Sequence, residues 1–529
     1  MHYFYWSDKL AADLPRDQQH VINDSKTPSG RIHIGALRGP LIHDLVYRSC
    51  LDANVVASFL FGSDDLDPLD NVPPYLNSEV YRPYLGMPLR YVPSPNANTS
   101  YSDYFMSDLL YAMQYVGIQA KPYRIGDYYV SGSFDEAIDL ILRNADTVRE
   151  IYKRVSDSDR PDGWLPIHPI CESCGRIATT TAIAYDGKEI TYQCSFDRVI
   201  YAKGCGHKGS RSPFGGRAKL PWKLEWAARW AVLGVTIEGA GKDHIVAGGS
   251  RHVAARVLDE VFHRTPPLNI PYEWLLAGGQ GMSTSMGVGY SVRHVADNML
   301  PELLRFSLVR QKPMKAIEFE MEGMAIPRLF DDYDACVDDS ADSTESNDNA
   351  EPHLRQRIIE LSQISANLQI PQRRLRFTEV ITLVQIPHVN VSQRAEEQLG
   401  HLSELEQADI RRRADYAEAW LKSGFAPDHV RFTLHETLPT VARGLSDKQR
   451  QFLGSLAQHL EKLEHWSGEY VHNLIYDVSK QITLTSKKAF SAIYLSFAGQ
   501  EFGPRAGNLL ANLDRDFVLT RLCQASDLG

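Results

Sequence analysis

The stretch HVINDSKTPSGRIHIGALRGPLIHDLVYRSCL, residues 20–51, decides the fold class. It opens on an apolar, strand-like segment, HVIND, and after a glycine-containing turn it continues as the helix-like ALRGPLIHDLVYRSCL. A second strand-like segment, VVASFLFGSDD, follows at residues 55–65. Strand, helix and strand in this order begin a βαβ unit, so the sequence predicts an α/β fold with helices on both faces of a parallel sheet.

Composition narrows the class of protein. A chain of 529 residues is too long for one core and predicts about two to four domains. Hydrophobic residues make up 43% of the chain, and no apolar run is long enough to span a bilayer, so we do not expect a membrane protein. The N-terminus lacks a secretory signal, which favours a cytoplasmic protein. The net charge of −10 does not indicate nucleic-acid binding, although a local basic face would suffice for it.

The alternation of strands and helices divides the chain. It runs through residues 1–160 and returns in residues 219–300, so we expect these segments to be two halves of one domain. The intervening residues 161–218 are rich in proline, glycine and cysteine and contain short β-like pieces. They predict a small module inserted into that domain.

The C-terminal part has a different pattern. Residues 301–350 form a connecting region that ends in DDYDACVDDSADSTESNDNAE, residues 331–351, whose acidic composition is typical of a solvated linker or surface loop. Residues 351–529 carry apolar side chains at spacings of three and four, which predicts a helical domain.

The turn TPSGRIHIGALR, residues 27–38, joins the first predicted strand to the first predicted helix. Gly30 and Gly35 permit close approach of a ligand to the backbone, and His33 lies in the turn. Free N–H groups and the positive end of a helix suit a phosphate at such a turn. A plain strand-to-helix turn would give the same short pattern.

Two later loops have a related pattern. GKDHIVAGGS, residues 241–250, follows a strand-like segment, and two such loops at one edge of a parallel sheet reinforce each other as a ligand site. Alternatively, Asp243 caps the helix and His244 is an ordinary core histidine. The third loop, GGQGMSTSMG, residues 278–287, has the frame of a phosphate-handling signature but contains no lysine.

Four of the seven cysteines lie between residues 171 and 205. Thiolate and imidazole ligands from two tight turns suit tetrahedral zinc in a reducing compartment. We expect zinc to be bound by Cys171, Cys174, Cys205 and His207, with Cys194 as the replacement for one of them. Buried cysteines without a metal, or a redox-active pair, are the alternatives.

Taken together, these motifs resemble those of the class I, archaeal-type, lysyl-tRNA synthetases. The ordered set is TPSGRIHIG, DGWLPIHPICESCGRI, GCGHKG, PWKLEWAARW, GKDHIVAGGS, PYEWLLAGGQGMSTSMG and FGPRAGNLLANLDRDFVLTRL, and it runs from about residue 20 to the C-terminus. The resemblance implies a Rossmann catalytic domain, a zinc-binding insertion and a C-terminal α-helical anticodon-binding domain. It also implies ATP, Mg²⁺ and Zn²⁺, with lysine and tRNA-Lys as partners.

The resemblance implies roles for individual residues. Adenylation is an in-line displacement at the α-phosphorus, which positioning and electrostatic stabilisation catalyse. The implied catalytic residues are His33, Gly35, Ser283 and Ser285. The implied ATP-binding residues are Pro28, Ser29, Gly30, His33, Gly35, Gly241, Asp243, Met282, Ser283, Thr284 and Ser285. The implied amino-acid-binding residues are Ser25, Thr27, Trp222, His244 and Tyr272, with core packing as the alternative for Trp222.

The sequence departs from the family pattern at several positions. Gly281 and Met286 stand where the signature loop usually carries lysines. Losing one such group costs about 3 to 4 kcal/mol of transition-state stabilisation if nothing replaces it. Ala36 replaces a residue that is often polar, and Ser25 replaces a common glycine near the amino-acid site. The cations that could replace the missing lysines are Lys26, Arg31, Arg38 and Arg293.

The C-terminal region supplies candidates for tRNA contacts, because single-stranded bases are read by stacking and hydrogen bonds once cations hold the backbone. The candidates are Arg373, Arg374, Arg376, Arg411, Arg412, Arg413, Trp420, Trp466 and Tyr470. A solvated helix face is the alternative for the arginine run.

These observations favour an aminoacyl-tRNA ligase that activates lysine with ATP and transfers it to tRNA-Lys. The lysine-free loop motivates two alternatives. One is a diverged paralogue that binds tRNA without charging it, and the other is an amino-acid-activating enzyme outside translation.

Overall fold

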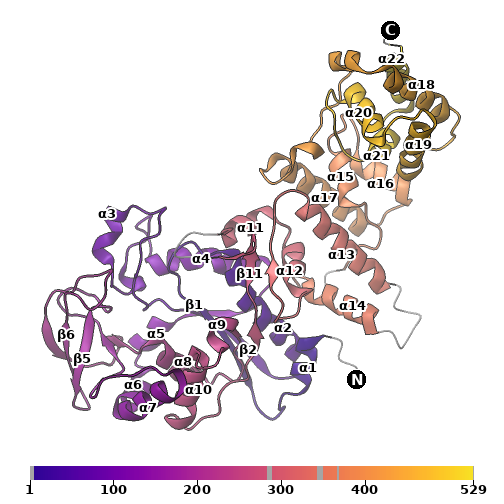
Figure 1. The fold of residues 1–529 in the computed structure, drawn as a ribbon. Coiled ribbons are helices and arrows are strands. Elements are labelled where there is room, and N and C mark those ends of the chain that lie inside the picture. The colour runs from indigo at the N-terminus through magenta and orange to yellow at the C-terminus, as the bar shows by residue number, and fades with distance from the viewer. Residues whose placement is uncertain (1–4, 283–288, 342–349, 366–368, 528–529) are drawn as a thin grey trace. The chain divides into compact units, whose positions relative to one another are not determined.

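The computed structural model describes residues 5–282, 289–341, 350–365 and 369–527 (Figure 1). The chain forms two compact units. The first unit contains residues 1–319 and 343–366, and the second contains residues 320–342 and 367–529. The chain therefore passes from one unit to the other near residues 320, 343 and 367. The sequence pattern suggests a single boundary near residue 350.

The first unit is built on the predicted parallel sheet. Strands β1 (His20–Lys26), β2 (Ala57–Ser63) and β3 (Lys121–Arg124) pair side by side in that order. Helix α2 (Arg38–Asp52), after the short 3₁₀ helix η1 (Ile34–Leu37), connects β1 to β2. The βαβ prediction and the α/β fold class are confirmed.

Consecutive residues of β1 contact different helices. The Asp24 carboxylate lies 3.6 Å from His43 Nδ1 on α2, whereas the Ser25 hydroxyl accepts a hydrogen bond from Arg229 on α8 (Trp222–Leu233). Successive side chains of a strand point to opposite faces, so β1 is covered by helices on both sides. Helix α10 (Ser250–Glu260) packs against α8 and against α7 (Ala145–Ser156).

The inserted module is antiparallel. Strands β5 (Thr180–Tyr185), β6 (Ile190–Cys194) and β7 (Lys208–Arg211) form its sheet, and β4 (His168–Pro169) pairs with β8 (Ala218–Lys219) where the module leaves and rejoins the unit. The other strands of the first unit are β9 (Ala240–Gly241), β10 (Pro271–Tyr272), β11 (Leu275–Ala277), β12 (Gln280–Gly281) and β13 (Ile317–Glu318). Its other helices before α12 are α1 (Trp6–Ala12), α3 (Ser78–Tyr81), α4 (Tyr101–Tyr115), α5 (Ile125–Val130), α6 (Asp135–Arg143), α9 (Lys242–Ile245) and α11 (Val292–Asn298).

Helix α14 (Ala350–Ser362) belongs to the first unit, although its sequence follows the acidic stretch. It packs against α12 (Pro301–Val309), and Arg357 on α14 forms ion pairs with Asp8 at 2.8 Å and Asp52 at 2.6 Å. Helical periodicity alone gives no sign of which core a helix joins. These ion pairs, together with the buried side chains of Ile359 and Leu361, hold α14 in the first unit.

The second unit is helical, as predicted, and the helices within residues 447–526 pack around one apolar core. Capping boxes begin two of its helices, since Ser403 pairs with Glu406 and Ser446 with Gln449. The helices are α13 (Ala325–Ala341), α15 (Phe377–Leu383), α16 (Val391–Leu399), α17 (Glu404–Lys422), α18 (Asp447–Glu461), α19 (Gly468–Gln481), α20 (Ser486–Phe497), α21 (Ala506–Asn512) and α22 (Arg515–Ser526). Among the described residues of both units, no helix is long and apolar enough to cross a membrane.

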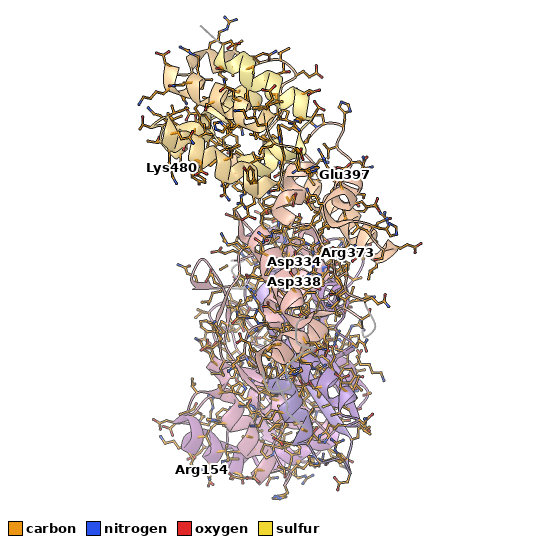
Figure 2. All side chains as sticks on the ribbon, turned by 90° about the vertical axis from the view of Figure 1, so that its right-hand side faces the viewer. Arg154, Asp334, Asp338, Arg373, Glu397 and Lys480 are labelled. Atoms are coloured by element: carbon orange, nitrogen blue, oxygen red, sulfur yellow. The ribbon has the colours of Figure 1, made fainter. Side chains whose placement is uncertain are left out.

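The expectation of a solvated linker is wrong for residues 331–341, which lie in α13. Asp334 accepts hydrogen bonds from Arg413 at 2.7 Å and from Arg374 at 3.1 Å, and Arg374 also pairs with Asp338. Figure 2 shows Asp334, Asp338 and Arg373 close together in this unit. Asp334 is therefore paired with buried arginines, whereas Asp331, Asp332, Asp338 and Asp339 are exposed, and composition alone does not distinguish the two kinds of residue.

We predict that Asp334→Ala destabilises the second unit by about 3 to 5 kcal/mol, because removing one partner leaves buried guanidinium charge uncompensated. The Arg413 and Arg374 side chains are only 3% and 4% exposed. Urea unfolding followed by circular dichroism measures the effect. Glu418→Ala, which breaks the exposed pair with Lys422, serves as the control and should cost less than about 1 kcal/mol. Equal effects of the two variants would contradict the prediction.

Candidate active site

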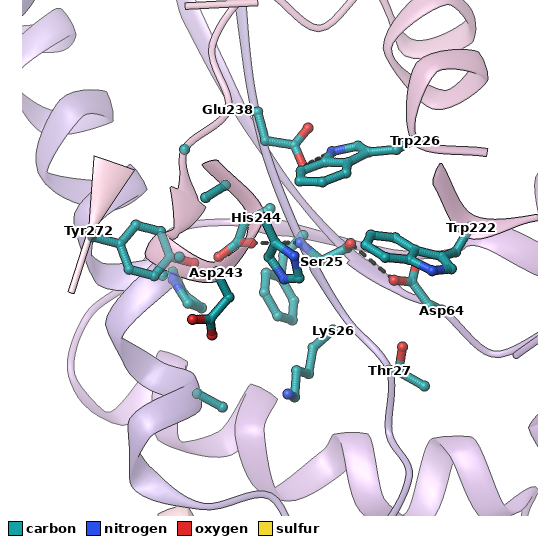
Figure 3. A pocket seen from close by; sticks show the side chains of 18 of the residues that line it. Ser25, Lys26, Thr27, Asp64, Trp222, Trp226, Glu238, Asp243, His244 and Tyr272 are labelled. Carbon is teal, nitrogen blue, oxygen red and sulfur yellow. Dashed lines mark hydrogen bonds between the residues drawn. The ribbon is translucent and has the colours of Figure 1, made fainter. Parts of the chain in front are cut away.

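A cavity of about 530 Å³ lies at the carboxyl ends of the strands of the first unit (Figure 3). Ser25 and Lys26 end β1, Gly241 ends β9 and Tyr272 ends β10, and all four residues line the cavity. Ligands of open parallel sheets bind at this edge. The fold therefore brings segments that are far apart in the sequence to one site.

Most of the predicted ligand-binding residues meet in this cavity. The ones that line it are Ser25, Thr27, His33, Gly35, Trp222, Gly241, Asp243, His244 and Tyr272. Pro28, Ser29 and Gly30 lie in the turn between β1 and η1 and are not among the lining residues. Met282 approaches the turn, since its methyl carbon is 3.5 Å from the position of a Cβ built on Gly35. Ser283, Thr284, Ser285 and Met286 lie outside the described residues.

The turn of residues 27–38, which we call the signature turn, holds His33 in a fixed place. His33 precedes η1 in an extended conformation, and the neighbouring Ile34 N–H donates to the Tyr290 carbonyl at 2.9 Å. A Cβ built on Gly35 would stand 2.8 Å from His33 Nδ1, so glycine is needed for this close approach. Burial, reinforced by the positive charge of Lys26, lowers the pKa of His33 to about 4. His33 is therefore a neutral imidazole near pH 7.

One arginine organises the opposite side of the cavity. Arg229 on α8 donates to Ser25, to Asp64 and, at 3.2 Å, to Glu225. Ser25 in turn donates to Asp64 at 3.1 Å. Although burial opposes it, the charge of Asp64 and the neighbouring acidic groups keep the pKa of Arg229 well above its usual range. The Ser25 hydroxyl, which replaces a common glycine of the family, is thus turned toward α8.

Three aromatic rings form a wall of the cavity. The ring centroids of Trp222 and Trp226 are 6.0 Å apart, and His244 meets Trp222 at 5.6 Å and Trp226 at 5.8 Å. Trp226 Nε1 donates to Glu238 at 2.9 Å. The Trp222 side chain is 45% exposed, so its position is not that of a core residue.

Most of the charged residues that line the cavity were not predicted from the sequence. Trp226 and Arg229 follow Trp222 at positions i+4 and i+7 on α8, a spacing that shares one helix face and could have identified them. The carboxylates come from strand ends and helices throughout the unit, and no local pattern groups them. They are Asp24, Asp64, Asp67, Glu225, Glu238 and Asp243, with Lys26 and Arg229 as the cations of the lining.

The inserted module gathers four cysteines, Cys171, Cys174, Cys194 and Cys205, whose sulfur atoms lie within 4.8 Å of one another. The Cys171 and Cys205 sulfurs are 3.6 Å apart, and those of Cys174 and Cys194 are 3.7 Å apart. Zinc–sulfur bonds of about 2.3 Å in a tetrahedron place the sulfurs about 3.8 Å apart, so the cluster fits that ion.

The preferred sequence-based set, which included His207, differs from this group. Cys194, the last residue of β6, is the fourth member of the cysteine group, and its N–H donates to the His207 carbonyl at 2.8 Å. His207 itself lies beside Tyr192, with ring centroids 5.9 Å apart. Sequence spacing leaves both residues available as ligands, and the described geometry groups Cys194 with the other thiols.

In the second unit, some of the candidates for tRNA contacts are buried or paired within the unit, and others are exposed. Trp420 is 3% exposed, and Arg373, Arg374 and Arg413 are engaged by Glu406 or Asp334. Trp420, Arg374 and Arg413 therefore serve the internal packing of the unit, whereas the side chain of Arg373 is 44% exposed. Arg412 pairs with Asp409 at 3.3 Å, and the Trp466 indole N–H donates to the Leu460 carbonyl at 3.2 Å. The exposed candidates are Arg373, Arg376, Arg411, Arg412 and Tyr470.

Two family models match the chain. The model described as tRNA synthetases class I (K) matches residues 4–365, and the one described as anticodon binding domain matches residues 426–526. The chain belongs to the class I lysyl-tRNA synthetase family. The expected family is thereby confirmed over both units of the synthetase.

Curated relatives span the whole synthetase. A lysine–tRNA ligase from Methanosarcina barkeri is 34% identical over 544 residues, covering 99% of this chain and 98% of the relative. Lysine–tRNA ligases from Archaeoglobus fulgidus and Methanocaldococcus jannaschii are 33% and 32% identical, and each comparison covers 98% of this chain and 99% of the relative.

The position of His33 in this synthetase predicts an unusual titration. In ¹⁵N-histidine NMR spectra, with His33→Asn used for assignment, the imidazole should stay neutral from pH 8 to pH 5 and protonate only near its lowered pKa of about 4. Lys26→Met should raise this pKa toward the ordinary value of about 6.5, because one positive charge is removed. Lys121→Met, on the exposed start of β3, is the control. Titration of wild-type His33 near pH 6.5 would be inconsistent with the buried turn.

Proposed function

We propose that this synthetase is a lysine–tRNA ligase, which activates lysine with ATP to lysyl-adenylate and transfers it to tRNA-Lys. The observation that carries the proposal is the cavity at the strand ends, where the signature turn, the GKDH loop and an acidic pocket meet. Similarity to lysine–tRNA ligases over nearly the full length favours charging of tRNA over the two alternatives. A translation enzyme of this kind works in the cytoplasm.

The acidic pocket suits the lysine side chain. The carboxylates of the lining outnumber its cations. Burial raises the pKa of Asp24 and of Asp64 to about 7, and a bound cationic side chain favours their charged forms, which a neutral or anionic one does not. The Trp222 ring gives the aliphatic part of lysine an apolar surface. The proposed amino-acid contacts are Ser25, Thr27, Trp222, His244 and Tyr272.

ATP occupies the other side of the cavity in this proposal. Its phosphates meet the backbone and the neutral imidazole of the signature turn, and Mg²⁺ arrives with the phosphates, as is usual for nucleotide sites. The lysine carboxylate oxygen attacks the α-phosphorus, and pyrophosphate leaves with the electron pair of the broken P–O bond. The proposed ATP contacts are Pro28, Ser29, Gly30, His33, Gly35, Gly241, Asp243 and Met282, together with Ser283, Thr284 and Ser285, which lie outside the described residues.

Lysine-dependent exchange of pyrophosphate into ATP, followed by charging of tRNA-Lys, tests the function. The wild-type synthetase should show both activities. Trp222→Ala should raise the KM for lysine about tenfold or more, because burial of the lysine methylenes against the ring is worth about 1.5 kcal/mol or more. The KM for ATP should stay unchanged.

Phe196→Ala, which removes an exposed ring of the inserted module, is the control and should leave both KM values unchanged. Exchange without charging would indicate an activating enzyme outside translation. Well-folded protein without exchange for lysine would refute the proposal.

For the inserted module we propose a structural zinc ion bound by Cys171, Cys174, Cys194 and Cys205. The sulfur separations support this set, and all four cysteines are free thiols. With four protein ligands such a site leaves no open position, so its contribution is to the stability of the module.

Metal analysis of the purified synthetase should therefore find about one zinc per chain. Cys194→Ser should lose the ion on dialysis, and His207→Ala should keep it, because only the first change removes a proposed ligand. Elemental analysis by mass spectrometry measures both. Retention by Cys194→Ser together with loss by His207→Ala would restore the histidine to the ligand set.

A further inference from the structure

The signature loop, residues 278–287, contains no lysine and so lacks the positive charge that would stabilise the phosphates in the proposed reaction. ATP brings a polyanionic triphosphate, and negative charge shifts toward the leaving pyrophosphate as the α-phosphorus is attacked. Gly281 and Met286 supply no charge for this step. A cation that faces the phosphates is therefore needed from another part of the unit.

Three of the four candidate cations are engaged elsewhere. Arg38 is buried and donates to the backbone carbonyls of Leu308 and Lys312, both at 3.0 Å. Arg31 lies over the Tyr75 ring at 4.4 Å. Arg293 pairs with Asp297 at 2.9 Å and lies 3.8 Å from the centroid of the Tyr111 ring.

The cations around the GKDH loop and α8 are engaged as well. Lys242 pairs with Glu273 at 2.8 Å and lies over Trp274, and Arg229 is held by Asp64 and Glu225. Only Lys26 remains among the cations that line the cavity. Among the residues that the structure describes, the side chain of Lys26 has no hydrogen-bond or ion-pair partner. Burial lowers the pKa of its ammonium, and the charges of Asp24 and Asp64 oppose that effect.

Strand alternation directs Lys26 toward the signature turn. Ser25 faces α8 and its arginine, so Lys26, the next residue of β1, points to the other face. Figure 3 shows its side chain extending away from Glu238 and Trp226. Burial is the main cause of the low pKa of both His33 and His244, and the charge of Lys26 lowers each further, so the ammonium lies near both loops.

We propose that Lys26 is the cation that contacts the ATP phosphates during adenylation, in place of the lysines missing from the signature loop. The inference rests on the proposed function. As the bond between the lysine carboxylate oxygen and the α-phosphorus forms, the bond from the α-phosphorus to the bridging oxygen breaks. The electron pair stays on the departing pyrophosphate, and Lys26 stabilises the charge of the phosphates in that transition state.

The test compares Lys26→Met and Lys26→Arg with the control Lys121→Met, each with and without the pair Gly281→Lys and Met286→Lys. Lys26→Met should lower the kcat of lysine-dependent exchange about 100-fold and weaken ATP binding in calorimetry about tenfold, with the KM for lysine nearly unchanged. Lys26→Arg should retain most activity, and Lys121→Met all of it. The two loop lysines should restore at least tenfold of the lost kcat in the Lys26→Met protein.

Unchanged kcat and ATP affinity in Lys26→Met would overturn the proposal, as would a change confined to the KM for lysine, which would place Lys26 against the amino acid. If Lys26→Met does not fold, loss of ATP binding in Lys26→Arg that the loop lysines cannot restore overturns it. Wild-type protein that binds ATP through Lys26 but performs no exchange with lysine would refute the proposed function and leave the role of Lys26 standing.

Discussion

The guanidinium of Arg229 holds the site together. It joins Ser25 at the end of β1 to Asp64 after β2, and it reaches them from α8, the first helix after the inserted module. Buried charges are tolerated only when they are paired, so Arg229 and Asp64 each require the other. The chain must therefore leave the inserted module at a point that places α8 against the sheet. The pairing of β4 with β8 closes that excursion, and the two halves of the catalytic unit meet at the cavity as a result.

Local patterns predicted much of this architecture. The βαβ start, the signature turn and the cysteine-rich insertion could all be identified because each depends on residues close in sequence. Predictions that depended on distant partners were less successful. Acidic residues of α13 looked solvated because Arg374 and Arg413, their partners, lie about 40 and 80 residues further along the chain. The placement of α14 depends on ion pairs to Asp8 and Asp52, which periodicity does not show.

The cavity shows the same division between local and distant information. Some lining residues, namely His33, Trp222 and His244, belong to short sequence motifs that identify them. Others, such as Asp64 and Glu238, are isolated acidic residues in the sequence. Only the parallel pairing of the strands brings their ends together. In the inserted module, spacing favoured His207 over Cys194 as the fourth candidate ligand. The fold instead places Cys194, at the end of β6, beside the other three thiols.

Two opposite charge requirements meet at the end of β1. A pocket for lysine needs excess negative charge, whereas the triphosphate of ATP needs positive charge, and only one strand end separates the two. Alternation of side chains serves both requirements, since Ser25 joins the acidic network of α8 while the charge of Lys26 acts on His33 of the signature turn as well as on Asp24 and Asp64. A group carried by a strand is positioned more precisely than one carried by a loop. With the positive charge moved from the loop to β1, the stabilising cation becomes part of the sheet that also builds the amino-acid pocket.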